Sequence, residues 1–102
     1  MKILVWIKEP HKKAHHVWIS SSLHNLQKTV GGYIETLTLA QDMVIICNEE
    51  GRLAGLEHNC FICGHDFVGT IIIAGVKDEE FASCKIDSKR MKDLFPGLFA
   101  ED

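Results

Sequence analysis

Four side chains that commonly bind zinc lie within one short stretch of the chain. The stretch reads His58-x-Cys60-x-x-Cys63-x-His65, and thiolates together with imidazoles are a usual ligand set for zinc. Structural zinc sites, however, usually take two ligands from each of two separated segments, and the sequence has no second Cys-x-x-Cys pair. We therefore predict no bound metal and interpret the two thiols as reduced cysteines in a loop.

Other reaction chemistry has little support in the residue pattern. A redox dithiol needs its Cys-x-x-Cys motif at the start of a helix, whereas Gly64 and a β-prone run follow Cys63. Glu35, Glu49 and Glu50 could supply an acid–base pair, but the last two are adjacent in a predicted turn, where carboxylates are simply solvated. No Ser-His-Asp order stands out either. We therefore predict that the protein is not an enzyme and uses no cofactor.

The bulk composition is that of one ordinary folded domain. The chain has 102 residues, of which 46% are hydrophobic and 25% charged, so it is too short for a second core and too apolar for disorder. Its formal net charge of −3 argues against general binding to nucleic acid. No apolar run approaches the roughly 20 residues of a membrane helix, and the N-terminal apolar stretch is too short for a signal peptide. We predict a single cytoplasmic domain over residues 1–102, without membrane attachment.

Several elements in the first half of the chain can be predicted from local signals. Three serines at residues 20–22 offer a helix N-cap. Leu23, Leu26 and Val30 follow at helical spacing and form one apolar stripe. The pair Gly31-Gly32 then ends the helix, because glycine adopts the left-handed conformation easily. The predicted elements are strands over residues 2–7, 15–19, 33–39 and 43–47 and a helix over residues 23–30.

The second half of the chain is less regular. Residues 48–51 form a predicted turn, in which Gly51 suits a position with positive φ. The remaining predictions are an irregular stretch over residues 52–61, a strong strand over 69–74, one helical turn over 79–83 and a short helix over 87–94. Together these elements predict an α+β fold. A mostly antiparallel sheet of five or six strands has one helix packed across it and a short helix at the C-terminus.

An ordered series of short motifs runs along nearly the whole chain. It includes Met-Lys-Ile-Leu-Val at residues 1–5, Val-Gly-Gly-Tyr-Ile-Glu at 30–35, Ile-Cys-Asn-Glu-Glu-Gly-Arg-Leu at 46–53 and Asp-x-Val-Gly-Thr at 66–70. With these motifs in this order, the chain resembles a small family of domains of unknown function. That family is frequent in phages and other mobile elements of Gram-positive bacteria.

The resemblance implies a biological context rather than a reaction. Small accessory proteins of phages often counter host defence, and some are compact oligomers that hold a nucleotide immune signal without cleaving it. A pocket for such a ligand combines aromatic stacking with polar groups. The polar members of the motif series are then the implied ligand-binding residues: Tyr33, Glu35, Asn48, Asn59 and Thr70. We expect a homo-oligomer that sequesters a small nucleotide-like ligand.

Alternative interpretations stay open for both the residues and the function. Asn48 could cap a turn, Asn59 could hold a loop, and Thr70 could simply belong to a strand. The protein could instead be an inhibitor or adaptor that binds a host defence protein, which an unpaired edge strand would favour. A third possibility is an enzyme that acts on a nucleotide signal with Glu35 or His65 as its base.

Overall fold

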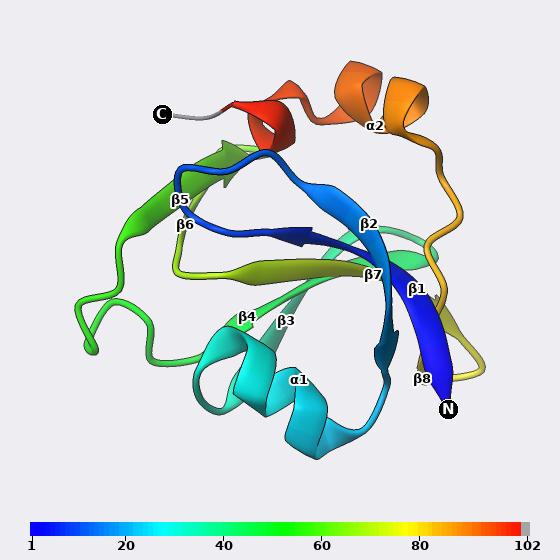
Figure 1. Cartoon of the computed structure of the whole chain (residues 1–102), viewed down its shortest axis with the longest axis horizontal. Coiled ribbons are helices and arrows are strands. Elements are labelled where there is room, and N and C mark those ends of the chain that lie inside the picture. The colour runs from blue at the N-terminus through cyan, green and yellow to red at the C-terminus, as the bar shows by residue number, and fades with distance from the viewer. Residues whose placement is uncertain (101–102) are drawn as a thin grey trace.

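The computed structural model of the protein describes residues 1–100. A twisted sheet lies across the middle, with α1 on one side and α2 on the other (Figure 1). None of the helices within the described residues is long and apolar enough to cross a membrane. The elements in chain order are β1 (Lys2–Lys8), β2 (His15–Ser20), α1 (Leu23–Val30), β3 (Ile34–Ala40), β4 (Met43–Asn48), β5 (His58–Ile62), β6 (His65–Val68), β7 (Ile71–Lys77), β8 (Glu80–Ala82), α2 (Ser88–Leu94) and the 3₁₀ helix η1 (Pro96–Phe99).

The main sheet is antiparallel and has the strand order β2-β1-β7-β4-β3, with β8 paired to β7 as the sixth strand. The central strand β7 is almost continuously apolar, and Ile71 to Ala74 are at most 1% exposed. Successive residues of a strand face opposite ways. Ile72 and Ala74 therefore pack into one core, and Ile71 and Ile73 pack into another. The predicted α+β fold, with five or six strands, a helix across them and a short C-terminal helix, is confirmed.

Helix α1 begins and ends at the residues that the sequence predicts. The Ser22 hydroxyl accepts a hydrogen bond from the Asn25 N–H at 3.2 Å, which satisfies one free donor of the first turn. Gly31 follows the helix with a φ of 86°, in the left-handed conformation. Leu26 and Val30 are buried against the face formed by β1, β4 and β7. This contact forms the first of the two cores.

The opposite face of the sheet is also covered, which the sequence analysis did not predict. The β5–β6 hairpin, α2 and η1 bury a second core there. The stretch predicted as irregular contains β5, so that prediction is wrong from His58 onward. In β5, Asn59 and Cys60 are both buried, and the pairing register shifts between His58 and Cys60. Such a bulge hides a strand from a search for two-residue periodicity.

The predicted helical turn over residues 79–83 is instead part of the β7–β8 hairpin. Asp78 and Glu79 have positive φ values of 52° and 66°, as in the tight turns that join antiparallel strands. Strand β8 then pairs with the end of β7, with Glu80 opposite Lys77 and Ala82 opposite Gly75. Glutamate rarely adopts a positive φ, so the sequence gives no clear signal for this turn.

Candidate functional site

The start of β3 and the end of β4 bring two of the sequence motifs into contact. The Glu49 N–H donates to the Tyr33 carbonyl at 2.8 Å, which extends the β3–β4 pairing by one residue. The Asn48 side chain fixes this corner from both sides. Its amide nitrogen donates to the carbonyl of Val30, the last residue of α1, at 3.2 Å, and its oxygen accepts from the Glu50 N–H at 2.8 Å. Asn48 thus caps the turn and ties it to the helix.

The turn after Asn48 packs closely against β6. Gly51 is buried, and a Cβ atom added there would lie 2.9 Å from Cγ2 of Val68. This close approach explains the glycine, because the positive φ predicted for Gly51 is not observed; Gly55 has a positive φ of 71° instead. The turn and β6 therefore form two walls of one groove.

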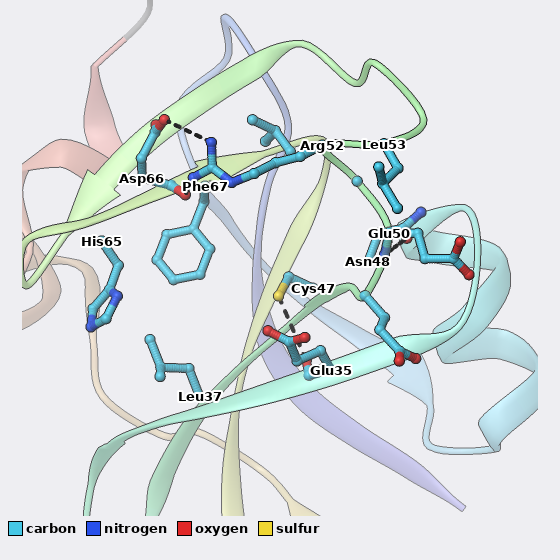
Figure 2. A pocket seen from close by; sticks show the side chains of 13 residues that line it. Glu35, Leu37, Cys47, Asn48, Glu50, Arg52, Leu53, His65, Asp66 and Phe67 are labelled. Atoms are coloured by element: carbon cyan, nitrogen blue, oxygen red, sulfur yellow. Dashed lines mark hydrogen bonds and ion pairs between the residues drawn. The ribbon is translucent and has the colours of Figure 1, made fainter.

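The groove lies between β3, the turn at residues 48–53 and β6, and has a volume of about 290 Å³. Figure 2 shows Leu37, Cys47 and Phe67 between the strands, with charged side chains around them. The Arg52 guanidinium lies over Asp66 at the β6 wall. The lining residues are Glu35, Leu37, Cys47, Asn48, Glu49, Glu50, Gly51, Arg52, Leu53, His65, Asp66, Phe67 and Val68.

Carboxylates dominate the electrostatics of the groove. Asp66 is the paired one: its Oδ2 lies 3.5 Å from Arg52 Nη1, and its Oδ1 lies 2.7 Å from His58 Nδ1. Arg52 Nη2 also donates to the Asp66 carbonyl at 2.8 Å. Three further carboxylates form no ion pair within residues 1–100; these are Glu35, Glu49 and Glu50. The groove therefore favours hydrogen-bond donors, and Arg52 is its one guanidinium for an anion.

The thiol at the base of the groove is held in its protonated form. Burial raises the pKa of Cys47 above its ordinary value, and the nearby charge of Glu35 raises this pKa further. The Cys47 thiol lies 3.7 Å from the Glu35 carbonyl, to which it donates. Because the thiolate is the nucleophilic form of cysteine, Cys47 is poorly suited to attack a bound ligand at neutral pH.

Three of the five ligand-binding residues suggested by the sequence lie together. Glu35 and Asn48 line the groove, while Asn48 and Tyr33 line an adjoining hollow of about 350 Å³. Tyr33 lies at the edge of this hollow and is 67% exposed. Groove and hollow share Asn48 and Glu50, so a ligand seated in the groove could reach the Tyr33 ring.

The other two suggested residues lie elsewhere. Asn59 is only 9% exposed, and its amide nitrogen donates to the carbonyls of Lys8 and Gly69, both at 2.7 Å. Asn59 therefore connects β5 to the end of β1 and to the segment between β6 and β7. This is the loop-holding role considered above. Thr70 is half-buried between β6 and β7 and lines neither the groove nor the adjoining hollow.

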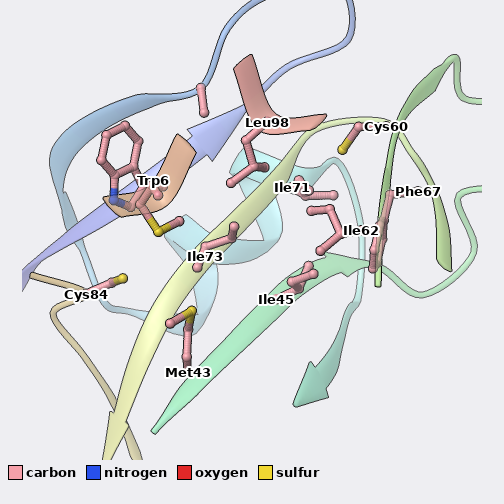
Figure 3. Packing of buried hydrophobic residues seen from close by; sticks show 12 residues of the cluster. Trp6, Met43, Ile45, Cys60, Ile62, Phe67, Ile71, Ile73, Cys84 and Leu98 are labelled. Carbon is pink, nitrogen blue, oxygen red and sulfur yellow. The ribbon is translucent and has the colours of Figure 1, made fainter. Parts of the chain in front are cut away.

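The four candidate zinc ligands point in different directions. Cys60 lies inside the second core, as Figure 3 shows, where burial raises its pKa to about 11. Cys63 is exposed in the two-residue turn of the β5–β6 hairpin, where it has a φ of 50°. His58 faces Asp66, and His65 is exposed. In the described part of the chain, no group of three or more His, Cys, Asp or Glu side chains is placed to hold a metal ion.

A second, wider hollow of about 650 Å³ lies at the far end of β4, beside β8. Its lining includes the aromatic ring of Phe81 and Gly75, which approaches the carbonyl of Ser83. Six charged side chains surround it without forming an ion pair among residues 1–100; these are Lys2, Lys77, Lys85, Asp42, Asp78 and Glu80. The sequence analysis missed this hollow because its residues come from separate segments.

Sequence reasoning also missed Arg52 and Phe67 as parts of the groove. Arg52 belongs to the motif at residues 46–53, which is a signal that could have found it. Phe67 and His65 reach the groove because the β5–β6 hairpin folds over the sheet. No local pattern in the sequence indicates that arrangement.

Comparison with curated proteins and with solved structures gives no significant match. A family model described as "Domain of unknown function (DUF3846)" matches residues 1–96. The match covers the groove, the hollow beside β8 and all five residues suggested for ligand binding. The chain therefore belongs to the DUF3846 family of domains of unknown function.

Proposed function

We propose that this protein binds and sequesters a small nucleotide-type immune signal without converting it. In this proposal it is a cytoplasmic, homo-oligomeric anti-defence protein of a phage or mobile element. The phage context is what the resemblance of the motif series to the family implies. The observation that carries the binding role is the groove itself, whose polar rim is held in place by Asn48 and by the Arg52–Asp66 pair.

The groove chemistry suits the sugar and base of a nucleotide. The carboxylates of Glu35, Glu49 and Glu50 can accept hydrogen bonds from ribose hydroxyls and from amino groups of a base. The exposed Tyr33 ring offers a stacking surface at the adjoining hollow. A phosphate would be placed at Arg52, where it would share the guanidinium with Asp66, rather than beside Glu35, Glu49 and Glu50, because like charges repel.

In the proposed function, Asn48 is a positioning residue. Both ends of its side-chain amide are already bonded to the protein, so it orients the turn rather than offering a free group. Asn59 and Thr70 contribute at a greater distance. Asn59 supports the segment that leads into β7 through its bond to the Gly69 carbonyl, and Thr70 follows that glycine. Preformed sites of this kind lose less entropy when a ligand binds.

Sequestration rather than turnover is supported by the state of the groove side chains. The Cys47 thiol stays protonated, and the carboxylates nearest to it are exposed glutamates. A general base near neutral pH usually needs burial or a neighbouring charge that shifts its pKa. The thiol and the glutamates of the groove therefore fit a holding role better than a catalytic one.

The direct test is to look for ligand carried by the purified protein. Heat-denatured protein is filtered, and the filtrate is analysed by mass spectrometry for nucleotides. Stripped protein is then titrated calorimetrically with cyclic nucleotides and ADP-ribose derivatives. We expect a released nucleotide, and at least tenfold weaker binding in Glu35→Gln and Tyr33→Ala. No released nucleotide and no heat with any of these compounds would contradict the proposal.

A protein–protein inhibitor or adaptor is the second candidate function. The observation that favours it is that, among residues 1–100, β2 and β3 are the edge strands of the main sheet and each pairs with a neighbouring strand on one side only. Trp18 on β2 is 57% exposed, and exposed aromatic side chains are frequent anchors in interfaces. This function predicts a stable complex with one host protein in pull-downs and no bound nucleotide. Loss of that complex in Trp18→Ser would support it.

A further inference from the structure

Strand β3 has few of the features that usually protect a sheet edge. It is seven residues long and forms one border of the main sheet. Edge strands are commonly protected by lysine, proline, bulges or a covering element. Strand β3 contains neither lysine nor proline, and its one charged residue is Glu35. Its pairing is regular from Ile34 to Thr38, and the register shifts only between Thr38 and Ala40.

The backbone groups that point out of this edge can be identified. The Glu49 N–H donates to the Tyr33 carbonyl, so the backbone groups of Tyr33 face β4. Backbone groups alternate sides along an antiparallel strand. Those of Glu35 and Leu37 therefore also face β4, while the N–H and C=O groups of Thr36 and Thr38 point away from the sheet.

The outer edge of β3 is complementary to a second copy of itself. When two β3 strands are paired antiparallel about Leu37, Thr36 stands opposite the partner's Thr38, and Leu37 stands opposite the partner's Leu37. Threonine pairs and apolar pairs are favourable across antiparallel strands. Glu35 stands opposite the partner's Leu39, so the two glutamates are far apart and no like charges meet.

We infer that the protein forms a two-fold dimer through antiparallel pairing of β3 with the β3 of a second copy. This inference specifies the oligomer of the proposed function and rests on that proposal. Glu35 and Leu37 line the groove, and paired strands lie about 4.8 Å apart. The partner's Leu37 and Leu39 therefore extend the wall of each groove, and the two grooves face the same side of one continuous sheet.

The other edge of the sheet provides the competing interface. The Ser21 N–H donates to the Met1 carbonyl, so by the same alternation the backbone groups of Trp18 point outward from β2. Strand β2 carries two histidines at its start and no repeated residue about its centre. It also lies away from the groove, so pairing through β2 would leave the ligand site of each copy unchanged.

The test is the mass of the 102-residue protein by sedimentation velocity, from micromolar to millimolar concentrations. We expect twice the chain mass of 11.5 kDa for the wild-type protein. Thr38→Lys places a charge on the β3 edge and is expected to halve the observed mass. The matched variant Trp18→Lys charges the β2 edge and is expected to keep the wild-type mass. Circular dichroism confirms that both variants are folded.

Hydrogen exchange in the wild-type protein supplies a measurement that needs no variant. The amide protons of Thr36 and Thr38 are expected to exchange more slowly as the protein concentration rises. A wild-type monomer at all concentrations, or a dimer that only Trp18→Lys disrupts, would overturn the inference. A dimer without bound nucleotide would support the pairing while contradicting sequestration, and nucleotide binding by a monomer would do the reverse.

Discussion

The groove beside β6 and the hollow beside β8 lie at opposite ends of β4 and differ in how their polar groups are held. In the groove, Asn48 forms two hydrogen bonds to the backbone, and Arg52 is paired with Asp66. In the hollow, the charged side chains are unpaired within the described residues. The hollow has the larger volume, about 650 Å³ against about 290 Å³. A ligand in the hollow would have to immobilise lysine side chains that form no ion pair, which costs entropy. The larger volume of the hollow therefore does not by itself make it the better site.

The largest effect is expected from Gly75→Ala, which disrupts the hollow. A Cβ atom at Gly75 would collide with the backbone carbonyl oxygen of Ser83, so β8 must move away from β7. We expect a loss of about 3 kcal/mol in the free energy of unfolding, measured by urea denaturation. The folded fraction should still bind ligand, because the groove is far from the change. A variant that stays stable but no longer binds would place the ligand in the hollow instead.

The next effect is expected from Asn48→Ala, which loosens the groove. It removes the bonds to the Val30 carbonyl and to the Glu50 N–H, and we expect a loss of about 2 kcal/mol in unfolding free energy. Asn48→Asp is the matched control: it keeps the acceptor for Glu50, removes the donor to Val30 and adds a negative charge beside Glu49 and Glu50. An intermediate loss for this control is expected. Equal losses for the two variants in high salt, which screens the added charge, would show that the acceptor contributes little.

A smaller effect is expected from Gly51→Ala. The added Cβ atom comes too close only to the Val68 side chain, at 2.9 Å, because the Asn48 carbonyl oxygen and Leu56 Cδ1 lie at an ordinary contact distance of 3.5 Å. A side chain can shift more easily than backbone. We expect a loss of about 1 kcal/mol in unfolding free energy. Ligand affinity should fall more than stability does, because the turn is pushed away from β6. Unchanged affinity in calorimetry would separate the turn from the ligand site.

The sequence predicted the elements that are set by local signals. The Ser22 cap and the Gly31 stop define α1, and apolar runs define the central strands. The missed elements depend on unusual backbone conformations instead. Strand β5 contains a bulge next to Asn59, and the β7–β8 turn places Glu79 at a positive φ. The helical turn predicted there was wrong because such a conformation has no clear signal in residue type.

The candidate site was predictable only where motif segments pair directly. Tyr33 and Glu35 meet Asn48 because β3 and β4 are neighbours along the chain. The contribution of β6 to the groove depends on how the β5–β6 hairpin packs over the sheet, which involves contacts between distant segments. The motif series suggested Asn59 as a ligand contact. Its side chain is buried, however, and donates a hydrogen bond to the carbonyl of Lys8 in β1.

The smallest effect is expected on the alkylation rate of the Cys47 thiol. This thiol lies in the groove and not in the hollow beside β8, so its reaction separates the two regions. This thiol lines the groove and has a raised pKa. Its alkylation by iodoacetamide should therefore be slower than that of an ordinary thiol at neutral pH, and its rate should keep rising at pH values where an ordinary thiol is already fully ionised. Ligand in the groove should slow the reaction further, as followed by mass spectrometry. Exposed Cys63 is the internal control, and equal protection of both thiols would contradict binding in the groove.

The most direct measurement of the central claim is an NMR titration of the ¹⁵N-labelled protein with the nucleotide that denaturation releases. Binding in the groove predicts that amide shifts cluster at Glu35, at residues 48–52 and at residues 65–67, with little change around β8. A cluster at Lys2 and residues 76–83, or no shifts at saturating nucleotide, would contradict the assignment of the groove as the ligand site.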